Sequence, residues 1–63
     1  SSETLKKDCF VAYTLGKIKT AIESAQRKRN EGLVVELAPY AMTKEEAEAY
    51  QKEKKYASLL YVE

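Results

Sequence analysis

Apolar residues in the first half of the chain recur at the spacing of an α-helix. The residues at this spacing are Val11, Leu15, Ile18, Ile22 and Ala25. Intervals of four, three, four and three residues place these side chains on one face of a helix. Asn30-Glu31-Gly32 then supplies a stop, because glycine readily takes the left-handed conformation that ends many helices. The pattern predicts one long helix over residues 3–30.

The segment 9–15 supports a second interpretation. Its Phe, Val, Tyr and Thr residues favour a strand, and Gly16 inside a helix would cost about 1 kcal/mol relative to alanine. A strand at residues 9–15 would give the order β-α-β-α-β. We favour the long helix, because the apolar stripe runs unbroken through Leu15 and Ile18.

The second half of the chain carries signals for a strand, a helix and a strand. Residues 33–37 and 58–62 are apolar, β-prone runs. Between them, Thr43 and Glu46 have the spacing of a capping box, in which each side chain accepts a hydrogen bond from the other residue's backbone N–H. The box predicts a helix over residues 44–55. A connection of this length favours parallel pairing of the two strands.

Together these elements predict one small α+β domain that needs further support. A chain of 63 residues holds a single domain and buries only about 60% of the surface that its unfolded form exposes. Two parallel strands alone are marginal, so a third is needed from residues 9–15 or from another molecule. Small domains gain stability from disulfides, bound metals or association with another chain. With one cysteine and no histidine, an internal disulfide and a zinc site are excluded, so association is the remaining means. We therefore expect the chain to dimerise or to dock on a larger protein.

The residue types argue against catalysis. The chain has no histidine and one cysteine, so no metal site, cofactor or nucleophilic centre is expected, and no catalytic residue is predicted. Cys9 stands among apolar neighbours and is interpreted as a small buried hydrophobe.

A single unpaired thiol is typical of a reducing, intracellular compartment, and we expect a cytoplasmic protein. No apolar run is long enough to span a membrane. Because the chain begins Ser-Ser rather than Met, we expect that processing or trimming has removed residues upstream, and the sequence does not say whether they included an export signal.

Four residues are candidates for binding a partner protein. On a helix over residues 3–30, Phe10 and Tyr13 project away from the apolar stripe and fall near Lys17. An aromatic pair framed by lysine resembles an interface anchor with a charged rim. The alternative is that Phe10 packs beneath the sheet or that this segment is a strand. Tyr40, in the loop after the first predicted strand, is the fourth candidate contact.

Charge supports a weaker alternative, a nucleic-acid-binding protein. The net charge of +1 indicates no such partner by itself, but residues 1–31 carry 7 − 4 = +3 and residues 32–63 carry 4 − 6 = −2. The candidate contacts to nucleic acid are Lys6, Lys17, Arg27, Lys28 and Arg29. The lysines among them are eleven residues apart and align on a continuous helix.

The predicted function is therefore protein binding without catalysis. The chain would act as a regulatory, inhibitory or accessory subunit whose partner is another protein or a second copy of itself, and not a membrane. A minor structural subunit of a large assembly is a further alternative.

Overall fold

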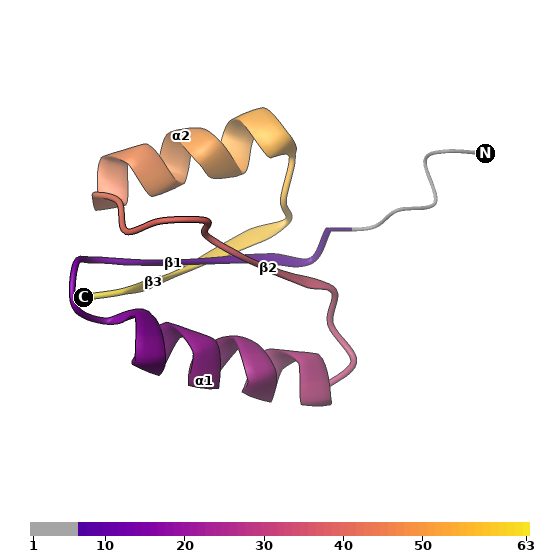
Figure 1. Ribbon diagram of the computed structural model, residues 1–63. Coiled ribbons are helices and arrows are strands. Elements are labelled where there is room, and N and C mark those ends of the chain that lie inside the picture. Colours follow the sequence, from indigo (N-terminus) through magenta and orange to yellow (C-terminus); the bar gives the residue numbers. More distant parts are fainter. Residues whose placement is uncertain (1–6) are drawn as a thin grey trace.

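Figure 1 shows the computed structural model, which describes residues 7–63. The elements in chain order are β1 (Cys9–Tyr13), α1 (Ile18–Asn30), β2 (Val35–Leu37), α2 (Lys44–Lys54) and β3 (Ser58–Val62). A small α+β domain is confirmed. The long N-terminal helix over residues 3–30 is wrong, because a strand comes first and the helix begins only at Ile18. The order is the β-α-β-α-β alternative, and the part of the predicted helix on residues 1–6 lies outside the described residues.

Burial explains why the first segment is a strand. All five residues of β1 are buried, as expected for a central strand covered on both faces. A turn then separates β1 from α1: the Lys17 N–H donates to the Thr14 carbonyl at 3.1 Å, and Gly16 has a φ of +89°. The apolar stripe read across this break therefore joined residues of two different elements.

The three strands form one parallel sheet in the order β2-β1-β3. Both outer strands are parallel to each other, as predicted, but each pairs with β1 between them. The third strand that the sheet needs is thus supplied by the chain's own first segment. Helix α1 covers one face of the sheet and α2 covers the other (Figure 1).

Helix α1 ends where its sequence predicts. The Gly32 N–H donates to the Arg29 carbonyl at 2.9 Å, and the Leu33 N–H donates to the Lys28 carbonyl at 3.3 Å. These two bonds form a Schellman motif, with Gly32 in the left-handed region at φ +93°. The predicted stop after Asn30 is confirmed.

Helix α2 begins with the predicted capping box. The Thr43 N–H donates to Glu46 Oε1 at 2.9 Å, and the Glu46 N–H donates to Thr43 Oγ1 at 3.1 Å. The box orders the start of the helix that carries the chain from β2 to β3.

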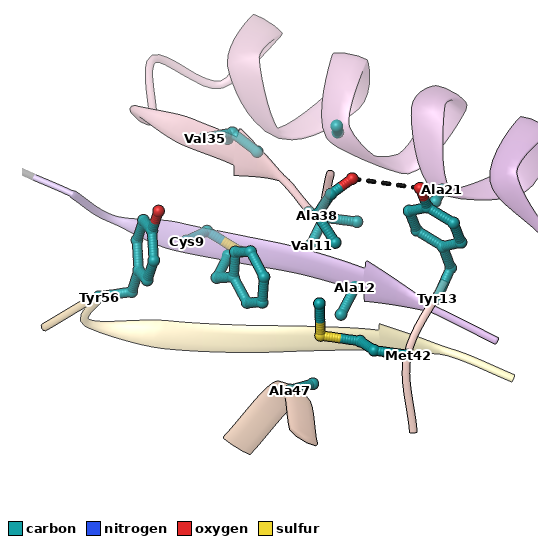
Figure 2. Close-up of a cluster of buried hydrophobic side chains, with 12 residues drawn as sticks. Cys9, Val11, Ala12, Tyr13, Ala21, Val35, Ala38, Met42, Ala47 and Tyr56 are labelled. Carbon is teal, nitrogen blue, oxygen red and sulfur yellow. Dashed lines mark hydrogen bonds between the residues drawn. The ribbon is translucent and has the colours of Figure 1, made fainter. Parts of the chain in front are cut away.

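Side chains of β1 fill both halves of the core. On the α2 face, Phe10 is fully buried, and its ring stacks with the rings of Tyr50 and Tyr56 at centroid distances of 4.7 and 5.0 Å. On the α1 face, Tyr13 lies near Ala21, and its hydroxyl donates to the Ala38 carbonyl at 3.1 Å (Figure 2).

The face of α1 that packs on the sheet is made of small residues. The buried residues of this helix are Ala21, Ser24 and Ala25. Of the predicted apolar stripe, Leu15, Ile18 and Ile22 are instead 86%, 50% and 49% exposed. Small side chains let a helix approach a sheet closely, so the larger aliphatic residues remain on its outer flank.

Candidate interface at the edge of the sheet

The outer edge of β2 is partly closed by a side chain from α1. The Cys9 N–H donates to the Val34 carbonyl and the Ala38 N–H to the Val11 carbonyl, so the backbone groups of Val35 point away from β1. At this edge Arg29 Nη2 donates to the Val35 carbonyl at 3.1 Å. Two features therefore disfavour pairing of another strand with β2: the strand has only three residues, and its outward Val35 carbonyl already accepts a hydrogen bond.

Among residues 7–63, no side chain hydrogen-bonds to the outer backbone edge of β3. The Thr14 N–H donates to the Val62 carbonyl at 2.9 Å, which fixes Val62 as a residue whose backbone faces β1. Because backbone direction alternates along a strand, the N–H and C=O groups of Leu59 and Tyr61 face away from β1. The strand Ser-Leu-Leu-Tyr-Val contains no charge, proline or glycine, the residues that commonly block pairing at an edge.

Neither helix of residues 7–63 packs over the α1 side of β3. Val11 pairs with Leu60 and Tyr13 with Val62, so these four side chains share the α1 face of the sheet. Helix α1 packs on β1 and β2, whereas α2 packs on β1 and β3. Leu60 and Val62 are consequently only half-buried. We call the outer backbone edge of β3, together with the side chains of Leu60 and Val62, the β3 surface.

The four residues predicted to bind a partner do not share one surface. Phe10 and Tyr13 are buried in β1, at 0% and 3% exposure, because the helical geometry that placed them outside does not apply to a strand. Lys17 is exposed at the start of α1, and Tyr40 is exposed beside α2, on the other face of the sheet. A role of Lys17 or Tyr40 in partner binding stays a prediction.

The basic residues proposed for nucleic acid are partly engaged within the domain. Arg27 Nη2 donates to Ser24 Oγ at 3.3 Å, and Arg29 is bonded to the edge of β2. Lys17 and Lys28 lie near opposite ends of α1, and Lys6 lies outside the described residues. The continuous helix on which the lysines were to align is absent from residues 7–63.

The sequence did not predict that Leu15, Ile18 and Ile22 would be exposed, because it placed them on the packed stripe of a helix. We call Leu15, Ile18 and Ile22 the α1 flank. The sequence feature that could have predicted this orientation of α1 is the row of small residues Ala21, Ser24 and Ala25, because small side chains mark the side of a helix that packs closely.

A hollow of about 410 Å³ opens at the carboxyl ends of the strands. Its lining residues are Thr14, Leu15, Ala41, Met42, Thr43, Lys44, Glu46 and Tyr61. Thr43 and Glu46 are bonded to each other, and the Tyr61 hydroxyl donates to the Met42 carbonyl at 2.8 Å. The main polar groups of the hollow therefore serve the fold, and they do not converge on a ligand.

Within residues 7–63, histidine, cysteine and carboxylate side chains form no group that could hold a metal ion, and Cys9 is a free, buried thiol. Neither described helix has the length and apolar character needed to cross a membrane. No protein-family model matches the chain, and no curated protein or solved structure matches it. What the domain does is therefore inferred from its geometry.

Proposed function

We propose that the protein is a small, non-catalytic protein-binding module that acts as a regulatory, inhibitory or accessory subunit. The observation that carries this proposal is the contrast between the two sheet edges: β2 is short and bonded to Arg29, while β3 is open and uncharged. An open edge accepts an extended strand of another chain through backbone hydrogen bonds.

The β3 surface favours a partner segment that is extended, uncharged and apolar at alternate positions. Leu59 and Tyr61 offer the outward backbone donors and acceptors, while Leu60 and Val62 offer an apolar face on the α1 side. Backbone bonds would provide affinity, and the apolar face would select side chains that cover it. A reducing intracellular setting is part of the proposal, since Cys9 is an unpaired thiol in the core.

Amide hydrogen exchange tests the proposal directly. In the free domain the Leu59 and Tyr61 amides should exchange quickly, while those of Leu60 and Val62, which face β1, should be protected. Addition of a synthetic extended peptide with alternating valine and threonine should protect the Leu59 and Tyr61 amides selectively.

Two variants separate backbone pairing from side-chain contacts. Leu59→Pro removes an outward N–H without removing a bond to β1, so the peptide should no longer protect the remaining outward amide, that of Tyr61. Leu59→Ala trims the side chain but keeps that N–H, so it should retain most of the protection. Peptide binding that leaves both outward amides unprotected would contradict the proposal.

A further inference from the structure

We propose that the strand received by the β3 surface is β3 of a second copy of this chain, running antiparallel about a two-fold axis. This inference rests on the proposed function and names its partner. It follows from the backbone pattern of β3, from the charges at the two ends of the strand, and from the uncovered face beside it.

The outward backbone groups of β3 are self-complementary. In an antiparallel ladder, a hydrogen-bonded pair of residues exchanges two N–H···O bonds. A two-fold axis beside Leu60 pairs Leu59 with Tyr61 of the second copy, and Tyr61 with its Leu59. Both residues present their N–H and C=O outward, so all of these groups find partners. The two three-stranded sheets then form one continuous sheet of six strands, three from each copy.

Charge favours the antiparallel direction over the parallel one. Strand β3 itself is uncharged, but exposed Lys55 precedes it and exposed Glu63 follows it. In the proposed register, Glu63 lies across from Ala57 of the second copy, beside the turn at which its Lys55 caps α2. The two-fold axis therefore brings unlike charges to the same end of the paired strands at two places. Parallel pairing in register would instead place like charges side by side.

The uncovered face gains apolar contacts in the same arrangement. Leu60 meets Leu60 of the second copy at the axis, where directly opposed Cβ atoms lie about 4.5–5.5 Å apart. Because α1 packs on β1 and β2, neither helix of residues 7–63 obstructs this contact. Pairing thus buries aliphatic surface that the single domain leaves partly exposed.

Sedimentation equilibrium over a range of concentrations tests the assembly. The intact chain should form a dimer, and Leu59→Pro should raise its dissociation constant roughly tenfold or more, because each dimer loses a hydrogen bond at two symmetric positions. Leu59→Ala should change the constant far less. Circular dichroism of each variant establishes that the domain is still folded.

Charge reversal tests the register. Glu63→Lys should weaken the dimer severalfold, and the double variant Glu63→Lys with Lys55→Glu should recover most of the loss. Glu23→Lys makes the same change in charge on the exposed side of α1 and should leave the dissociation constant unchanged. A double variant no tighter than Glu63→Lys alone would overturn the antiparallel register.

Other outcomes separate this inference from the proposed function. A chain that stays monomeric at about 1 mM, while the peptide still protects Leu59 and Tyr61, overturns the second copy and leaves the protein-binding module standing. If the chain stays monomeric and the peptide does not protect the outward amides, both the second copy and the protein-binding module are overturned. A dimer that Ile22→Ser disrupts and Leu59→Pro does not would assemble through the α1 flank, which also overturns the inference.

Discussion

The ring of Phe10 stacks on the ring of Tyr50, with 4.7 Å between the centroids and 9° between the planes. Both residues were visible in the sequence as aromatics, but their contact joins the central strand to the helix that follows β2. Phe10 therefore links β1 to α2 through this ring contact.

Phe10→Ala should lower the free energy of unfolding by about 3–5 kcal/mol, because it leaves a cavity under two tyrosine rings. Phe10→Leu, which keeps much of the volume, should cost less. Urea denaturation followed by circular dichroism measures both. If the Phe10→Ala variant is as stable as the parent chain but no longer self-associates, Phe10 is an interface residue, as the helical interpretation of the sequence predicted.

Local signals in the sequence predicted local structure well. The capping box of Thr43 and Glu46 and the stop at Gly32 are complete within a few residues, and both are confirmed. The identity of β1 depends on more distant residues. Its pairing with Val35 and Ser58 joins segments that lie far apart in the chain, and such pairing overrides helical periodicity.

The site was harder to predict than the fold for the same reason. The apolar run 58–62 predicts a strand that would readily pair with another chain if it were left unpaired, but its place at the edge of the sheet follows only from the strand order. The engagement of Arg29 with Val35 requires a flank of α1 to meet the edge of β2, and no spacing in the sequence encodes this contact. Leu60 is only half-buried because α1 packs on β1 and β2 and not on β3.

Two helix ends take the left-handed conformation with different residues. Gly32 does so at φ +93° without steric cost, whereas Lys55 does so at φ +64° with a Cβ atom. Gly32→Ala should lower stability by about 1 kcal/mol, and Lys55→Gly should raise it by up to about 1 kcal/mol. Thermal unfolding at low concentration measures both variants without a contribution from self-association. A shift of the same sign in the two variants would contradict this explanation.

Tyr56 should make stability decline at alkaline pH. Burial raises the pKa of its phenol above the usual value of 10.0, with smaller contributions in the same direction from the charge of Glu36 and from Tyr50. The unfolded chain thus ionises at this residue before the folded chain does. The stabilisation is fully present below the unfolded pKa and is lost as pH rises through the folded one.

The comparison of the parent chain with Tyr56→Phe isolates this effect. Above about pH 9, the unfolding free energy of the parent should fall more steeply than that of the variant, while titration of the lysines cancels in the difference. Glu36→Gln should reduce the difference but leave part of it, since burial is the larger cause. Identical slopes for the parent and Tyr56→Phe would exclude a shifted Tyr56.

Loss of the Arg29 contact should convert β2 into a second open edge. Arg29→Ala frees the Val35 carbonyl and should lower the free energy of unfolding by about 1 kcal/mol. It should also promote association beyond the dimer, because the six-stranded sheet would then present an open β2 edge at each end. Urea denaturation and light scattering measure the two effects.

Arg27→Ala serves as the matched control: it removes a neighbouring guanidinium that bonds Ser24 within the helix, so it should leave the association state unchanged. If both arginine variants associate equally, the association results from loss of positive charge, and the explanation through the open β2 edge is wrong.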